Sequence, residues 1–405
     1  MIGNSAARAL VKPLASLRLT VILLALSIFL IFSGTWAQID MGIWTTLETY
    51  FRAFFVWIPF RIFLPRHWDV PGGIPFPGGW LIGGLLMINL VTAHAVRFRY
   101  NRKRAGILLI HTGLILLLVG ELITGLEAHE GRMSIDEGQS VDFAEDTRSV
   151  ELAIIDPSDP TRDWVVAIPE SRLRHAGLIQ DTRLPFDVQV EAWFHNAELF
   201  EGGAQDIATA AAAPVANRGF AAELGARARP RPPTSGVDQD EIDLPAAYVS
   251  VLKEGRQYGT FLAALYFSLV PRFGPQDVQV GDKTYRMALR YVRDYKPYSI
   301  SLLDFRHDRY LGTETPRNFS SRIRLVDAAH NEDREVLIYM NNPLRYRGET
   351  FYQASFKQGD GGTVLQVVRN PGWLLPYVAC TVGALGMMLQ FGTHLLRFIR
   401  RTRTA

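Results

Sequence analysis

Apolar residues gather in four long runs along the chain, at residues 19–37, 79–96, 105–124 and 373–396. Each run has close to the 20 residues, roughly, that a helix needs to cross the hydrocarbon core of a bilayer. The pattern therefore predicts a membrane α-helical protein with four transmembrane helices. A cleaved signal peptide is the alternative for the first run, since basic residues precede it and it ends in "TWA". We favour an uncleaved anchor, because the run is long for a signal peptide and further spans follow it.

Residues 125–372, between the third and fourth runs, follow a different pattern. Short segments rich in Val, Ile, Tyr and Phe alternate apolar and polar positions between turn signals, as in "SVELAIID", "FDVQVEAWF", "AAYVSVL", "YSISLLDF" and "REVLIYM". This period of two predicts a large, mainly antiparallel β domain of sandwich or open-barrel type. Residues 201–241 are rich in Ala, Gly and Pro without strand periodicity, and they predict a mobile insertion or a short Ala-rich helix.

The distribution of charge orients the spans. The loop at residues 97–104, "RFRYNRKR", has five basic residues and no acidic one, and the tail at residues 397–405 carries four arginines. Short, strongly basic segments stay in the cytoplasm. Residues 1–18, this loop and the tail are therefore expected on the cytoplasmic side of the cell inner membrane, and the β domain on the extracytoplasmic side. The net charge of +3 gives no reason to invoke nucleic acid.

The first extracytoplasmic loop, residues 38–78, contains the aromatic segment "TLETYFRAFFVWIPFRIF". Aromatic residues interrupted by Arg52 and Arg61 predict a helix lying at the membrane interface, in contact with lipid headgroups. An extra span is the alternative, but it would bury both arginines. The single cysteine, Cys380, lies in the fourth run, which excludes an intramolecular disulfide, a CxxC redox pair and a thiolate zinc site.

Three of the nine histidines lie inside predicted spans, and two of them flank the basic loop. His94 precedes the basic loop and His111 follows it, which places both imidazoles at similar depth, about 5 Å and 10 Å below the cytoplasmic boundary. Ionisable groups at such depth are costly and usually face a cavity, a partner or a cofactor. Neutral imidazole suits haem iron as an axial ligand. The alternatives are an interhelical hydrogen bond or a side chain that reaches the interface. Glu121 and His394, near span ends, are predicted to be interfacial residues.

Six segments of the sequence also resemble one family, the ResB (CcsB-type) proteins of the system II pathway for cytochrome c maturation. They are "SLRLTVILLALSIFLIFSGTWAQ", "GILLIHTGLILLLVGELITG", "HEGRMSIDEGQS", "KPYSISLLDF", "YLGTETPRNFSS" and "YRGETFYQASF". Each segment alone is weakly specific. Their order, together with four spans and one β domain, carries the resemblance.

The resemblance implies a function and a set of partners. Such proteins work with a second membrane protein of the CcsA/ResC type, which carries a tryptophan-rich haem-binding segment. Together they move haem b across the membrane and attach it to the CxxCH motifs of apocytochrome c. The resemblance further implies that His111 is an axial ligand of the haem iron within the membrane. His94 has no firm counterpart in the family and stays a second candidate ligand.

The chain departs from a complete enzyme of this kind, because it has no tryptophan-rich haem segment. It is therefore expected to be a non-autonomous component of a cytochrome c haem lyase complex. Because the chain has no thiol outside the membrane, a separate thiol-reducing pathway protein is implied as well.

Two functions of other classes stay open on the sequence alone. The first is a membrane-tethered structural or scaffold protein of the cell envelope, with the histidines as packing residues and no cofactor. The second is a transporter or proton relay that uses His94, His111 and Glu121. It is disfavoured, because the spans contain few buried charges and no inverted repeat.

Overall fold

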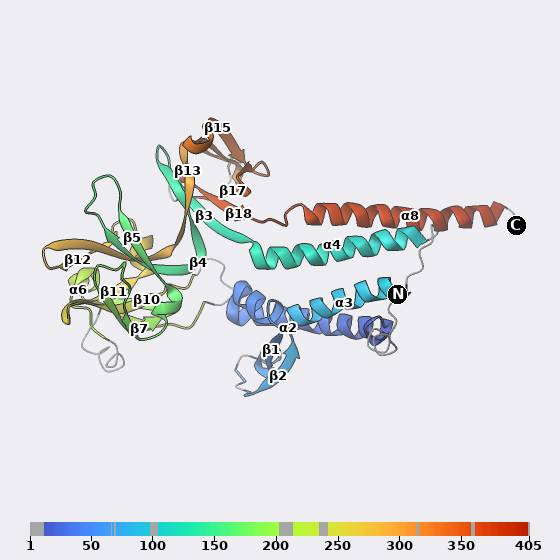
Figure 1. The fold of residues 1–405 in the computed structure, drawn as a ribbon, viewed down its shortest axis with the longest axis horizontal. Helices are drawn as coiled ribbons and strands as arrows, with labels where there is room; N and C mark the ends of the chain where they lie inside the picture. Colours follow the sequence, from blue (N-terminus) through green and yellow to red (C-terminus); the bar gives the residue numbers. More distant parts are fainter. Residues whose placement is uncertain are drawn as a thin grey trace. The chain divides into compact units, whose positions relative to one another are not determined.

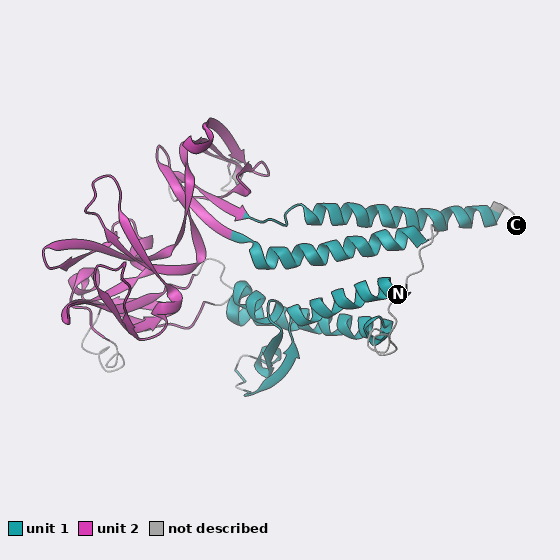
Figure 2. Cartoon of the chain, viewed as in Figure 1, with its two compact units in different colours: residues 1–129, 235–239, 369–405 teal, residues 130–234, 240–368 magenta. Residues whose placement is uncertain are grey.

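The computed structural model describes residues 12–65, 67–68, 70–97, 104–201, 214–234, 242–312, 316–357 and 361–403. The chain forms two compact units (Figure 2). The first comprises residues 1–129, 235–239 and 369–405 and is mainly helical. The second comprises residues 130–234 and 240–368 and is mainly β. The four transmembrane helices and the large antiparallel β domain predicted from the sequence are thus confirmed, with each in its own part of the chain.

Four long helices make up most of the first unit (Figure 1): α2 Leu17–Thr46, α3 Gly79–Arg97, α4 Ala105–Glu127 and α8 Leu375–Arg403. All four are long and apolar enough to cross a membrane. Ser16 caps α2 by accepting a hydrogen bond from the Leu19 amide. Helix α2 continues well beyond the predicted span, with non-helical backbone at Gly42, into a π-helical turn, η1 Leu47–Phe51. Helix α8 likewise extends through most of the basic tail.

The pairing of α4 with α8 depends on glycine. Gly106, Gly113 and Gly120 are buried and stand seven residues apart on α4. A Cβ atom at Gly113 would lie 2.7 Å from the Ala379 carbonyl oxygen, and one at Gly386 of α8 would lie 2.7 Å from the Ile110 amide nitrogen. Since both positions lack a Cβ, the two backbones approach each other closely, as small residues allow in membranes. This face of α4 is therefore fully used by α8.

The predicted interfacial helix in the first loop is wrong. Residues there form strand β1 Phe55–Pro59, which pairs antiparallel with β2 Gly73–Pro77, and a 3₁₀ helix, η2 Phe60–Phe63. Burial alternates along β1, since Val56 and Ile58 are buried while Phe55 and Trp57 are exposed. The prediction was based on the aromatic composition and did not take this period of two into account. Pro59 also ends any helix at this point, because proline has no amide hydrogen to donate.

The described residues of the β domain contain three short helices and one 3₁₀ turn. The strands follow the predicted segments closely. The helices are α5 Glu170–Leu173, α6 Gly219–Leu224 and α7 Leu265–Leu269, and the 3₁₀ turn is η5 Ala328–His330. The strands are β3 His129–Asp136, β4 Ser140–Asp156, β5 Trp164–Pro169, β6 Gly177–Ile179, β7 Asp187–Phe194, β8 Ala197–Glu201, β9 Ala226–Pro230, β10 Ala246–Lys253, β11 Arg256–Ala264, β12 Gln276–Val280, β13 Lys283–Arg309, β14 Pro316–Asp327, β15 Glu332–Tyr339, β16 Leu344–Tyr346, β17 Glu349–Phe356 and β18 Gly362–Arg369.

One large sheet organises the domain. Its strand order is β15-β14-β13-β4-β3-β18-β17-β16, with β12 paired to β13 and β5 paired to β4. Reciprocal backbone hydrogen bonds between Tyr339 and Asn342 close the turn that follows β15 and precedes β16. A four-stranded sheet, β11-β10-β7-β6, completes the layer opposite β4 and β13. The expected large, mainly antiparallel β architecture is therefore present.

The long strands β4 and β13 take part in two hydrophobic cores. Near one end, Leu152 and Met287 pack with residues of β7, β10 and β11. Near the other end of β13, Ile300 and Leu302 pack with residues of β14, β17 and β18. The register between β4 and β13 shifts after Tyr291 and again after Tyr295. These irregularities bend the strands between the two cores.

The predicted mobile insertion at residues 201–241 is partly wrong. Residues 214–234 contain the short helix α6 and strand β9, which pairs with β8. Ala221 and Ala228 are buried there, and the Ala228 amide donates a hydrogen bond to the hydroxyl of the buried Tyr248. The alanine-rich composition of this segment led to the prediction of a mobile insertion. In the structure, its alanines supply small side chains for a packed layer. Residues 202–213 and 235–241 lie outside the described residues.

Candidate functional site

The two membrane histidines lie in direct contact. His94 of α3 and His111 of α4 approach with 2.9 Å between His94 Nε2 and His111 Nδ1. The two imidazole rings are 4.7 Å apart and nearly perpendicular, with an interplanar angle of 88°. Both side chains are partly buried. The similar depth predicted from the sequence is thus matched by an interhelical hydrogen bond.

The hydrogen bonds of the pair define which nitrogen carries each proton. His94 Nδ1 lies 2.8 Å from the Leu90 carbonyl oxygen. A carbonyl can only accept, so His94 Nδ1 donates and His94 Nε2 of the neutral ring keeps a lone pair. His111 Nδ1 must then donate to His94 Nε2, and the lone pair of His111 is on Nε2. No described residue forms a hydrogen bond with that atom.

This arrangement gives the two histidines different chemistry. A histidine that ligates a metal usually donates its other ring N–H to a fixed acceptor, which sets the tautomer and raises the basicity of the ligand. His94 is such an acceptor for His111. An iron atom between the two rings is excluded in this geometry, because metal–imidazole bonds of about 2 Å on each side need nitrogens farther apart than a hydrogen bond. The residues present therefore fit a haem iron at His111 Nε2, with His94 as the residue that orients it.

Helix α4 presents these groups on opposite sides. Residues 111 and 113 are separated by about 200° around a helix. Gly113 lies against α8, and His111 faces α3 and His94. The close α4–α8 contact thereby fixes the direction in which His111 points.

The other candidates of the membrane helices lie apart from the pair. Glu121 is exposed and is ten residues from His111 in the same helix, which corresponds to about 15 Å. His394 contacts Gln390 of its own helix, with 2.9 Å between the two side-chain nitrogens. In the described part of the chain, no group of three or more His, Cys, Asp and Glu residues is arranged to hold a metal ion. A relay joining His94, His111 and Glu121 is therefore not assembled here.

One polar residue of the spans was missed by the sequence reasoning. Asn89 of α3 is only 3% exposed, accepts a hydrogen bond from Thr20 and donates to the carbonyl oxygens of Leu14 and Ser16. It ties the first turn of α2 to α3, about a turn and a half before His94 on the same helix. The sequence did contain a signal, because Asn89 is a polar amide inside an apolar run. Such a residue is costly to place in a membrane without hydrogen-bond partners.

The β domain contains a separate cluster built from the motifs "KPYSISLLDF" and "YRGETFYQASF". Glu349 of β17 accepts hydrogen bonds from Lys296, at 2.5 Å, and from the Tyr298 hydroxyl. All three side chains are nearly buried. Burial and the Glu349 carboxylate raise the pKa of Tyr298 above its usual range. The Tyr298 ring also contacts Tyr346, whose hydroxyl donates to the buried carboxylate of Asp327.

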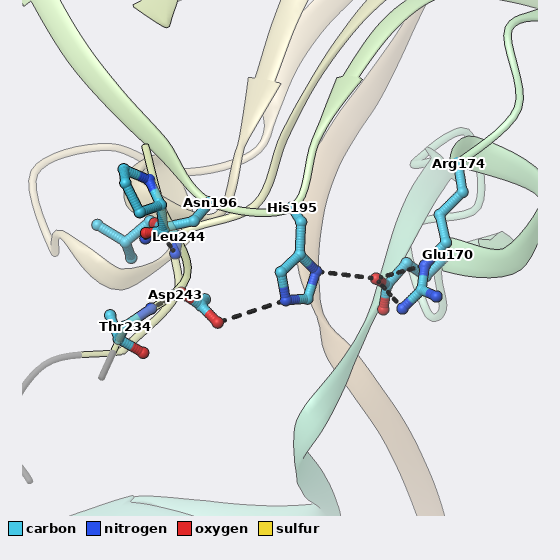
Figure 3. A network of polar contacts seen from close by, with 8 residues as sticks. Glu170, Arg174, His195, Asn196, Thr234, Asp243 and Leu244 are labelled. Carbon is cyan, nitrogen blue, oxygen red and sulfur yellow. Dashed lines mark hydrogen bonds and ion pairs between the residues drawn. The ribbon is translucent and has the colours of Figure 1, made fainter. Parts of the chain in front are cut away.

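A third cluster holds His195 between two carboxylates (Figure 3). His195 Nε2 lies 3.3 Å from Asp243, and His195 Nδ1 lies 3.9 Å from Glu170, which is also paired with Arg174. The hydrogen bond with Asp243, followed by that with Glu170, raises the pKa of His195 to about 9. These contacts join α5 and the residues before β10 to the turn after β7 (Figure 3).

The raised pKa of His195 predicts a stability that depends on pH. A raised pKa means that the folded protein holds the proton more tightly, so the contribution is complete below the ordinary histidine pKa of 6.5 and is lost as the pH rises through about 9. The side chain is 54% exposed, so solvent screening limits the effect to at most about 1 kcal/mol. We expect the melting temperature of the wild type, measured by circular dichroism, to fall between pH 7 and pH 10 by more than that of His195→Gln. Equal falls in both proteins would contradict this role.

Comparison with known proteins finds a family match for part of the chain. Residues 262–364 match the ResB-like family. Over 309 residues, which is 75% of the chain, the sequence is 24% identical to Protein NrfI of Wolinella succinogenes. The match covers 29% of the length of NrfI. The family match runs from β11 to β18 and includes the Lys296–Glu349 cluster but not His94 or His111. For the part of the chain that it covers, the ResB-like match agrees with the family that the motifs resemble.

Proposed function

We propose that this chain is a membrane subunit of a system II cytochrome c synthetase, which helps to export haem and deliver it to the CxxCH motifs of apocytochrome c. The observation that supports this most directly is the oriented His94–His111 pair. A neutral imidazole with its lone pair on Nε2, held in an apolar helix, is suited to bind the iron of a flat, apolar haem. The ResB-like region supports the same function from an independent part of the chain.

In this proposal the two histidines have separate tasks. His111 Nε2 binds the iron of haem b, which is the transported substrate. His94 accepts the Nδ1 proton of His111, and so keeps the ring in the required tautomer and orientation. The second axial ligand comes from a CcsA/ResC-type membrane partner. Both tasks depend on neutral rings, which the apolar surroundings favour.

The proposal includes further components of the complex besides this chain. Its single cysteine, Cys380, lies in α8, so reduction of the substrate cysteines requires a separate thiol-reducing protein. The basic segments before α4 and in the tail support our proposal that the β domain lies on the extracytoplasmic side of the inner membrane. There it meets apocytochrome c and the partner's haem segment. The covalent step belongs to the complex and not to this chain alone.

A deletion in the native host tests the function. Without this chain, we expect covalently bound haem, detected on denaturing gels, to disappear from all c-type cytochromes served by the pathway. Cytochromes that hold haem b without covalent bonds should remain, because haem synthesis is unaffected. A plasmid copy of the wild-type chain is the control and should restore the c-type signal. Unchanged c-type cytochromes in the deletion strain would favour the scaffold alternative.

A further inference from the structure

A cavity in the β domain is lined by an arginine whose hydrogen-bonding capacity is largely unused. The cavity has a volume of about 550 Å³, within the range of sites for small organic molecules. Strands β4, β5 and β13 form one wall, and α7 with the loop after it forms another. Ile155, Val165, Leu265 and Leu269 supply apolar surface.

Arg290 of β13 is the polar group at the base of this cavity. The residue is only 7% exposed, and its Nε donates to Glu151 of β4 at 3.0 Å. In the described structure this is the one hydrogen bond of the Arg290 side chain. The two terminal nitrogens therefore keep four N–H groups without a protein acceptor. Neither terminal nitrogen is a fully enclosed atom without a partner, so these N–H groups are accessible to a ligand in the cavity that Arg290 lines.

The remaining charged groups of the cavity are accounted for differently. Glu145 accepts a hydrogen bond from Arg293 at 3.1 Å, and this pair is part-exposed. Asp163 also lines the cavity and is exposed, which places it at the solvent-facing rim. Tyr291 lines the cavity and is half-buried, and its hydroxyl makes no hydrogen bond with a described residue. The inner part of the cavity thus offers donors and apolar walls, and the rim carries the acid.

We propose that this cavity binds a carboxylate carried on an apolar body, with the end of the Arg290 guanidinium as its anchor. The two terminal N–H groups of a guanidinium are parallel and fit the two oxygens of a carboxylate. Glu151 already balances the charge of Arg290, so the guanidinium orients the carboxylate through hydrogen bonds and adds little net charge to the site. Burial of the ligand's apolar body against the cavity walls supplies the remaining affinity. A small aromatic acid and the propionate side chains of a porphyrin share this chemistry.

Calorimetry on the full-length chain in detergent tests the proposal with matched acid and neutral probes. The probes are 2-naphthoate with 2-naphthamide, and protoporphyrin IX with its dimethyl ester. Removing Arg290 alone would leave Glu151 buried without a partner, so the variant is Glu151→Gln with Arg290→Met, which removes both charges together. Arg286→Met is the control, because Arg286 is an exposed arginine of the same strand.

We expect at least one acid to bind the wild type and Arg286→Met, and its affinity to fall by about tenfold or more in the double variant. The neutral counterpart should bind weakly to all three proteins. Which acid binds identifies the source of the carboxylate. The proposal is overturned if neither acid binds, if acid and neutral probe bind equally, or if a double variant with unchanged circular dichroism keeps full affinity.

Discussion

Replacing His111 by alanine is expected to remove the haem that we propose this residue binds within the membrane. The substitution deletes the Nε2 lone pair that the His94 contact leaves available, and no other described histidine lies against the pair. In the protein purified with the proposed CcsA/ResC-type partner, the Soret band should disappear or shift. Added imidazole should restore it, because the cavity left by the side chain admits a free ligand. The visible spectrum of reduced wild-type and variant protein measures this directly.

Two further variants separate the role of His111 from that of His94. His94→Leu removes the acceptor for the His111 Nδ1 proton but leaves the Nε2 lone pair, so haem affinity should fall by about 10–100-fold without being abolished. His394→Ala, in α8, is the matched control and should leave the spectrum unchanged. An unchanged Soret band in His111→Ala would move the ligand to the partner. A complete loss in His94→Leu with retention in His111→Ala would exchange the two roles.

The sequence predicted those elements whose pattern depends on neighbouring residues. The alternation in "FDVQVEAWF" became β7, where Val188 and Val190 are fully buried, and the Gly348 turn in "YRGETFYQASF" became the β16–β17 hairpin. The aromatic segment before Pro59 was misread, because composition was weighed above the alternation of Val56 and Ile58. Local patterns therefore sufficed wherever the period was read before the residue type.

Contacts between distant residues could not be predicted in the same way. The bond between Arg290 and Glu151 joins residues 139 positions apart, and its partner choice follows from the register of β4 against β13. The sequence predicted a similar depth in the bilayer for His94 and His111. The hydrogen bond between them, which indicates that His94 orients His111, is known only from the structure. The tautomer depends on the Leu90 carbonyl, a backbone atom that has no signature in the sequence.

Glu349 has a structural role, although a motif search would treat such a charged residue as a candidate catalytic group. Its carboxylate lies between Lys296 and Tyr298, and the Lys296 and Glu349 side chains are 7% and 9% exposed. Asp294 is the second partner of Lys296, at 2.6 Å, but its side chain is 72% exposed. A buried ammonium group and a buried phenol thus depend on one acceptor, which joins β13 to β17 across the sheet.

Glu349→Ala is therefore expected to destabilise the β domain by about 3–5 kcal/mol, because breaking a buried ion pair leaves the other charge without compensation. Chemical denaturation of the full-length chain in detergent, followed by the β signal in circular dichroism, measures the change. Glu335→Ala, an exposed position on β15, is the control and should change stability by less than about 0.5 kcal/mol.

The triple variant Lys296→Met, Tyr298→Phe, Glu349→Leu decides whether the loss comes from the stranded charge. It removes all three polar ends and keeps comparable apolar volume, so most of the stability should return. If the triple variant is as unstable as Glu349→Ala, packing of β17 and not the uncompensated lysine determines the cost. Recovery would instead show that the cluster specifies how β13 meets β17 while adding little net stability. The Lys296–Tyr298–Glu349 cluster would then serve to position the strands of the region that matches the ResB-like family.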